Sequence, residues 1–173
     1  MTMILGGTNP AVTFPDGTIQ NTAAVVNGSV PYSVLPTGSV LQVINATYNT
    51  QVATTTTGTL TGLTATITPK FSTSKILVLV DQAGCFNGSG TASVMFLALQ
   101  RNGVTLQGFE NFGGYQSANQ AQDFGSCSIN YLDSPATTSA TTYRTIVSSS
   151  STGSVAVQYN ASVSSITLME IAG

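Results

Sequence analysis

Residues 60–68, LTGLTATIT, contain the pattern that most restricts the fold of this chain. From Leu63 to Thr68, apolar residues alternate with threonines. In an extended segment this alternation puts the apolar side chains on one face and the threonines on the other. The segment therefore predicts a β-strand with one face buried and the other exposed.

The composition favours strands throughout the chain. Hydrophobic residues make up 42% of the sequence and charged residues only 6%, against a usual charged share of about a quarter. Threonine is β-branched and suits a pleated, half-buried surface, whereas Lys and Glu, which are common on helix surfaces, are nearly absent. The sequence therefore predicts an all-β protein.

Strand patterns continue from Ser39 to the end of the chain. About nine short apolar segments are separated by turn residues, which is typical of an antiparallel β-sandwich or jelly roll. Asn102-Gly103 predicts a two-residue hairpin between ASVMFLALQ and VTLQGF. The segment KILVLV, residues 75–80, does not alternate, which predicts a central strand covered on both faces. We expect a jelly-roll-like antiparallel sandwich over residues 39–173.

Residues 1–38 have a different character and predict an extended arm. They contain four of the six prolines, several glycines and no sustained periodicity. Within the arm, residues 12–14 and 18–20 are expected to pair around Pro15-Asp16-Gly17, whose residue types suit a tight turn. A hairpin of this size is marginal in water by itself, so it is expected to fold against another protein surface.

The low charge has a consequence for assembly. Sheet edges are usually protected by lysine and other charges, and this chain has four Lys and Arg residues in total. We expect the edges to be covered by other copies of the chain, and a monomeric sandwich with short, bulged edges is the alternative. A net charge of −2 offers no basic surface for binding nucleic acid. No apolar segment of the sequence is long enough to span a membrane.

Residues for catalysis are few. The chain has no histidine, which removes the commonest general base and metal ligand, and no phosphate-binding glycine motif is present. We expect no enzyme activity, no cofactor and no metal. A glycosidase needs only two carboxylates, and Glu110 with Asp123 is the pair to consider. Asp16 and Asp133 are assigned to turns, and Glu170 to an exposed strand face.

The two cysteines, Cys85 and Cys127, are far apart in the sequence. Cys127 alternates with Ile129 and Tyr131, which indicates a small core residue. Buried free thiols are the favoured interpretation in a reducing cytoplasm, and a disulfide is the minority one.

Residues 107–125 are expected to form a long polar loop that carries aromatic rings. Phe109, Phe112 and Tyr115 are candidates for stacking on sugar rings of a host surface. The alternative is that the rings plug the end of the sandwich or fill a subunit interface. That alternative is favoured for Phe124, and Tyr115 is left open between the two.

The segment TFPDGTIQNTAA resembles the FPDGT-x-Q-x-T-A motif of fibre-type proteins of tailed bacteriophages. The rest of the chain is similar to a domain of such proteins, especially in phages of cyanobacteria and other aquatic bacteria. The matching segments are PTGSVLQV, TSKILVLVD, LQRNG, YLDSPATTSATTYR and ITLMEIAG.

The resemblance implies a homotrimeric virion protein that is assembled in the bacterial cytoplasm and anchored by its arm. The arm residues expected to attach it are Phe14, Pro15, Asp16, Gly17 and Ile19. Its partners would be its own copies, other phage structural proteins and a host envelope glycan. A tail fibre is the first interpretation. A capsid decoration protein or head fibre is the second, and a polysaccharide depolymerase and a free carbohydrate-binding module are less favoured.

Overall fold

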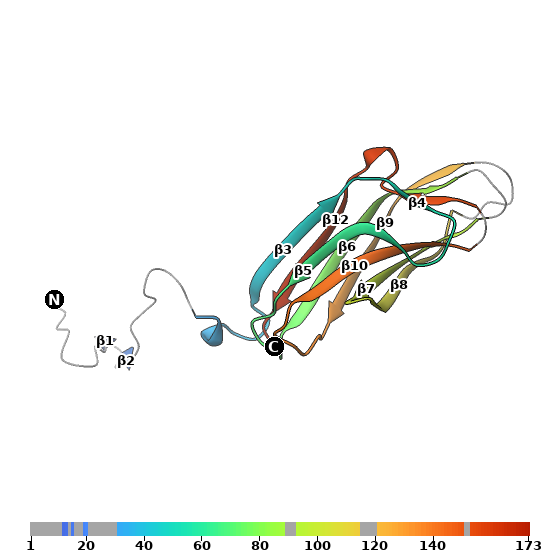
Figure 1. Ribbon diagram of the computed structural model, residues 1–173. Helices are drawn as coiled ribbons and strands as arrows, with labels where there is room; N and C mark the ends of the chain where they lie inside the picture. Colours follow the sequence, from blue (N-terminus) through green and yellow to red (C-terminus); the bar gives the residue numbers. More distant parts are fainter. Residues whose placement is uncertain are drawn as a thin grey trace. The chain divides into compact units, whose positions relative to one another are not determined.

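The computed structural model describes residues 12–13, 15, 19–20, 31–88, 93–114, 121–150 and 153–173 (Figure 1). It divides into two compact units, Met1–Pro36 and Thr37–Gly173. In the first unit, β1 (Val12–Thr13) and β2 (Ile19–Gln20) pair, and a 3-10 turn, η2, spans Tyr32–Val34.

The second unit consists of two antiparallel sheets that pack face to face (Figure 1). One sheet has the order β5-β10-β7-β8, and the other has the order β3-β12-β6-β11-β4, with β9 also paired to β6. The predicted all-β sandwich is confirmed. The strands are β3 (Val40–Tyr48), β4 (Val52–Thr54), β5 (Thr59–Ile67), β6 (Lys75–Asn87), β7 (Met95–Arg101), β8 (Val104–Gly113), β9 (Gln122–Asp133), β10 (Thr141–Ser149), β11 (Val155–Val157) and β12 (Ser164–Ile171), with a 3-10 turn, η3, at Tyr159–Ala161.

The strand pairing is nested, which is the arrangement of a jelly roll. Apart from the short β4 and β11, the first strand β3 pairs with the last strand β12, and β5 pairs with β10. Inside these, β6 pairs with β9 and β7 with β8. The second unit is thus a long antiparallel hairpin that is rolled up so that alternate strand pairs fall in opposite sheets.

The tip of this rolled hairpin is the predicted two-residue turn. Arg101 opposes Val104, and Asn102 and Gly103 have φ angles of 48° and 87°. Positive φ at both central positions suits the right-handed twist of the flanking strands, and Asn-Gly adopts it at little cost. The Asn102 side chain adds a bond, because its Oδ1 accepts the Thr142 N–H at 2.9 Å.

The interior contains two apolar clusters. The first cluster lies between β5, β10, β7, β6 and β12, with Leu63, Ile76, Val78, Tyr143 and Leu168 among its buried members. The second cluster lies toward the other end of β6, β7 and β10 and includes residues of β11; its buried members are Cys85, Met95, Leu97, Val147, Val155 and Val157. Alternation explains this burial, since in β5 the inward side chains of Leu63, Ala65 and Ile67 are at most 6% exposed.

Some predicted elements have different bounds in the structure. KILVLV is only the first half of β6, which continues to Asn87. Its inward residues, Ile76, Val78 and Val80, are buried, whereas Leu77 and Leu79 are partly exposed on the outer face. The short strand β4 was not predicted.

Candidate functional site

The arm contains the predicted hairpin. Val12 opposes Gln20 and Thr13 opposes Ile19, and Pro15 lies in the exposed turn between them. Phe14, Asp16 and Gly17 lie outside the described residues. The role of this hairpin in attachment stays a prediction.

The predicted loop over residues 107–125 is shorter than expected, because strands occupy most of it. β8 continues through Phe109 and Phe112 to Gly113, and β9 begins at Gln122. Phe109 is partly buried and packs against both apolar clusters, so it is a core residue rather than a surface contact. The prediction that Phe109 and Phe112 belong to a loop is wrong, because Gly108 and Gly113, which flank them, are accommodated in an irregular strand with register shifts.

Two of the aromatic side chains have the accessibility that the sequence suggested. Phe112 is 62% exposed and is therefore available for a surface contact. Phe124 packs against the second cluster from β9, in agreement with the expected role as a plug. Tyr115 lies outside the described residues.

The candidate carboxylate pair is engaged in local hydrogen bonds. Glu110 Oε1 accepts the Phe112 N–H at 2.9 Å, and Asp123 Oδ1 accepts the Gly125 N–H at 3.0 Å. Both bonds fix the backbone two residues further along the chain. Each carboxylate therefore has a structural role at the end of its strand.

Glu170 is buried, and its expected position on an exposed strand face is wrong. Its side chain has no solvent exposure. Oε1 accepts the Lys70 N–H at 2.6 Å, and Oε2 accepts from Gln42 Nε2 at 2.5 Å. A buried carboxylate needs such donors in place of water, and they come from the loop that follows β5 and from Gln42 on β3. Glu170 thus ties this loop to β3 and β12.

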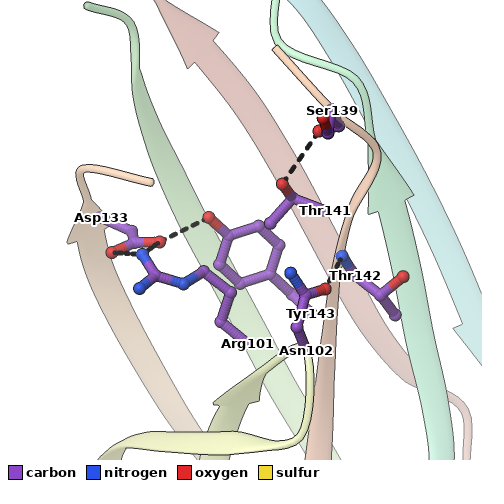
Figure 2. A network of polar contacts seen from close by, with 7 residues as sticks. All are labelled: Arg101, Asn102, Asp133, Ser139, Thr141, Thr142 and Tyr143. Atoms are coloured by element: carbon purple, nitrogen blue, oxygen red, sulfur yellow. Dashed lines mark hydrogen bonds and ion pairs between the residues drawn. The ribbon is translucent and has the colours of Figure 1, made fainter. Parts of the chain in front are cut away.

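Asp133 also has a different role from the expected one. It is 6% exposed, and Arg101 Nη1 donates to both of its oxygens, at 2.9 Å and 2.8 Å (Figure 2). The Tyr143 hydroxyl donates to Oδ2 at 2.6 Å. Since Asp133 lies on β9 and the other two residues on β7 and β10, the network joins the two sheets at one end of the sandwich.

The electrostatics of this network favour a neutral tyrosine. Burial, followed by the bond to Asp133, raises the pKa of Tyr143 well above its ordinary value. The bond to Asp133 raises the pKa of Arg101 further. The network holds a fixed ion pair rather than a group poised to exchange protons near neutral pH.

A belt of polar side chains crosses the interior between the two apolar clusters. Thr145 Oγ1 donates to Gln82 Oε1 at 2.8 Å, and Gln82 Nε2 donates to Ser164 Oγ at 2.9 Å. Thr61 and Thr145 share a hydrogen bond of 2.5 Å between their hydroxyls. All four residues are buried. This polar belt, defined as Thr61, Gln82, Thr145 and Ser164, links the two sheets and was not predicted, because Gln82 occurs in a long apolar strand.

The outer face of the sheet β3-β12-β6-β9 carries a row of apolar side chains. In the strand register, Met169 opposes Val43 and Leu77, and Leu77 opposes Leu132. Val43 and Leu132 are 52% and 54% exposed, and Leu77 and Met169 are partly exposed. We call Val43, Met169, Leu77 and Leu132 the outer apolar row. It crosses all four strands, and Leu79 and Ile171 extend it on either side.

The other sheet has a shallow hollow of about 150 Å³ on its surface. It is lined by β5 and β10, and Arg144 at its border donates from Nε to Gln100 Oε1 at 3.0 Å. Its lining is made of Leu60, Gly62, Leu63, Thr64, Thr142, Arg144 and Thr145. This lining offers neither a carboxylate nor a thiol, so it gives no support to catalysis.

Among the described residues, no cluster of three or more cysteine and acidic side chains is suited to hold a metal ion. No helix in the described ranges is long and apolar enough to cross a membrane.

Three solved structures from infectious bursal disease virus are similar to this chain. The infectious bursal disease virus VP2 subviral particle shares 13% identity over 86% of this chain and 37% of its own, with a TM-score of 0.48. The structure of T=1 particles derived from infectious bursal virus shares 15% sequence identity over 86% of this chain and 41% of its own, with a TM-score of 0.42. The structure of the Gt strain of infectious bursal disease virus shares 15% sequence identity over 93% of this chain and 46% of its own, with a TM-score of 0.39.

This chain spans less than half of each of these structures. No protein-family model matches the sequence, and no curated protein matches it. The jelly-roll topology described above follows from the strand pairing alone.

Proposed function

We propose that this chain is a structural protein of a tailed-bacteriophage virion. It acts as a homotrimeric tail fibre whose N-terminal arm attaches it to the particle, and its distal surface contacts a host envelope glycan. The proposal is supported by the resemblance of TFPDGTIQNTAA to phage fibre proteins and by the separation of an arm unit from a sandwich unit.

The outer apolar row is the observation that carries this proposal. A contiguous apolar surface on a charge-poor sheet favours association with another protein surface. The face around it offers few charges to oppose contact, since Lys75 and Asp81 lie at the two ends of the exposed part of β6. Burial of the row between copies would remove apolar area from water without placing many charges in the interface.

A second candidate is a trimeric decoration of the phage head. It is favoured by the sequence, in which no shaft sequence or repeat separates the arm from the sandwich region. The arm would then clamp neighbouring capsid subunits. Quantitative mass spectrometry of purified particles distinguishes the two roles, since a fibre occurs in at most a few dozen copies and a decoration in hundreds.

Self-association is tested by sedimentation of the full chain at micromolar concentration. A trimer is expected for the wild type, and Val43→Lys is expected to shift it to the monomer by placing a charge in the row. Val104→Lys is the matched control, because Val104 is 67% exposed and lies at the β7–β8 turn. A wild-type monomer, or equal behaviour of the two variants, would contradict the proposal.

Attachment is tested by removing residues 1–24. The truncated protein is expected to keep the melting temperature of its sandwich and to be absent from purified particles. Gly17→Val is the finer variant, because a β-branched residue resists a left-handed turn position. It is expected to reduce incorporation more than stability. Loss of the folded sandwich on truncation would show that the arm is part of the fold.

Binding and hydrolysis of host glycan are separated by two sets of variants. Phe112→Ser is expected to weaken adsorption to host cells while the far-ultraviolet spectrum is unchanged. Neither the wild type nor the Glu110→Gln and Asp123→Asn variants are expected to degrade purified envelope polysaccharide. Clearance of that polysaccharide by the wild type, abolished in either variant, would replace the structural proposal with a depolymerase.

A further inference from the structure

The two cysteines, distant in the sequence, meet inside the sandwich. Cys85 on β6 is a fully buried member of the second apolar cluster, and Cys127 on β9 is partly buried and packs against that cluster. β6 and β9 are neighbouring strands over this region. The structure therefore places two thiols on adjacent strands of one sheet, both on its inner side.

A β-bulge brings Cys85 to the inner side. Before the bulge, β6 buries Val80 and Gln82, so strict alternation would turn Cys85 outward. The register passes from Gln82 opposite Cys127 to Cys85 opposite Gly125, so β6 contains one extra residue. Such an extra residue reverses which face the following side chains occupy.

Gly84 makes this bulge possible. Its φ is +60°, and a Cβ at this position would lie 2.5 Å from the Tyr159 backbone nitrogen. Any other residue would be strained and would contact the backbone of η3. The orientation of Cys85 toward Cys127 is thus determined by the local backbone rather than by a rotatable side chain alone.

The two thiols perturb each other. A hydrogen bond with Cys85 lowers the pKa of Cys127, against the opposing effects of burial and of Glu110. The same hydrogen bond and burial raise the pKa of Cys85. Glu110 Oε2 lies 3.8 Å from the Cys127 sulfur. Cys127, which is also the more accessible thiol, is therefore the one that forms a thiolate first.

We propose that Cys85 and Cys127 are a redox pair that closes to an intramolecular disulfide between β6 and β9 when the protein meets a small-molecule disulfide. The Cys127 thiolate attacks one sulfur of oxidised glutathione, and one glutathione thiolate leaves. Cys85 then loses its proton and attacks the Cys127 sulfur, and the second glutathione leaves. Two protein thiols are oxidised, and one glutathione disulfide is reduced to two thiols.

The first experiment treats the folded full-length wild type with oxidised glutathione, followed by alkylation in denaturant and intact-mass measurement. The expected product has lost two hydrogen atoms, carries no alkyl group and migrates as a single chain on a non-reducing gel. The melting temperature is expected to rise by about 5–10 °C, because the bond closes a long loop of the unfolded chain. Two alkyl groups per chain, or a disulfide between chains, would overturn the proposal.

Two single variants test the order of the steps. Cys85→Ser is expected to stop at a mixed disulfide, visible as one added glutathione on Cys127. Cys127→Ser is expected to stay unmodified under the same native conditions, because the remaining thiol is buried. Stable glutathione addition to Cys127→Ser, with none on Cys85→Ser, would reverse the assigned roles.

Discussion

The two ends of the sandwich interior are closed by different chemistry. At the carboxylate end, defined by Glu170, Asp133 and Arg101, buried charged groups are fully engaged in short hydrogen bonds to the backbone, an amide and a guanidinium. At the thiol end, defined by Cys85, Cys127 and Phe124, the closing groups are sulfur atoms and an aromatic ring. The polar belt separates the two ends.

This difference indicates how well each end of the interior tolerates the substitution of a side chain. A charge-assisted hydrogen bond in a buried site fixes direction as well as distance. If one partner is removed, the other is left without a hydrogen bond, because water does not reach the site to replace it. Sulfur and aromatic contacts depend less on direction and adapt more easily. We therefore expect the carboxylate end to be intolerant of substitution and the thiol end to be adaptable.

The largest effect is expected for Glu170→Ala at the carboxylate end. The change leaves the Lys70 N–H without this acceptor and removes one of the two acceptors of Gln42 Nε2, which keeps its bond to the Thr68 carbonyl. We expect a cost of about 3 kcal/mol in the free energy of unfolding. Urea denaturation measures it. The exposed Asp81→Ala is the control, with an expected change within about 0.5 kcal/mol. Equal effects of the two variants would remove the distinction between buried and exposed carboxylates.

The polar belt is tested by Gln82→Leu, which leaves Thr145 and Ser164 each without one buried partner. We expect a loss of about 2 kcal/mol in the free energy of unfolding, despite the greater hydrophobicity of leucine. Gln107→Leu, at an exposed position of β8, controls for the change of side chain. A stabilised Gln82→Leu protein would show that the belt is not required to hold the sheets together.

Tyr143→Phe removes the phenol that donates to Asp133, with an expected cost of about 1–2 kcal/mol at neutral pH. The raised pKa also predicts a pH dependence. The neutral phenol contributes its full stability below the unfolded pKa of 10.0, and this contribution is lost as the pH rises from there toward the folded pKa.

The Tyr143→Phe variant is therefore expected to lose less stability than the wild type between about pH 10 and 11. Denaturation across this range measures the difference. Tyr131→Phe, a partly buried position of β9, separates the effect from the loss of a tyrosine in general. Parallel pH profiles of wild type and Tyr143→Phe would contradict the assignment.

The smallest effect is expected at the thiol end, for Glu110→Gln. The change removes a negative charge near Cys127 and keeps an oxygen that accepts the Phe112 N–H, so the stability should change by less than about 0.5 kcal/mol. Because Glu110 raises the pKa of Cys127, its removal should lower the pH midpoint for alkylation of Cys127. An unchanged or higher midpoint would contradict this electrostatic role.

Much of the fold was predictable because local residue patterns specify it. The alternation after Leu63 gives the inner and outer faces of β5, and Asn102-Gly103 gives the tip of the rolled hairpin. The arm hairpin was predictable from its turn residues. In each case the signal lies within a few neighbouring residues.

The errors concern residues whose partners are distant in sequence. Glu170 was assigned to an exposed face, but its partner Lys70 lies a hundred residues away, and tertiary contacts decide its burial. Asp133 was assigned to a turn because Arg101 and Tyr143 could not be placed beside it. Cys85 lies near Cys127 because of a bulge in β6, which reverses the alternation of inward and outward side chains on which the sequence prediction relies.

The nested pairing of strands has a consequence for the order in which the protein can be completed during translation. β12 is the last strand of the jelly roll to be synthesised, yet it lies between β3 and β6 rather than at an edge. Until it leaves the ribosome, β3 has no neighbour on that side and β6 has an open flank. Contacts between strands this remote in sequence form slowly. The nascent chain therefore exposes unpaired strand edges for longer than a protein built from local hairpins does.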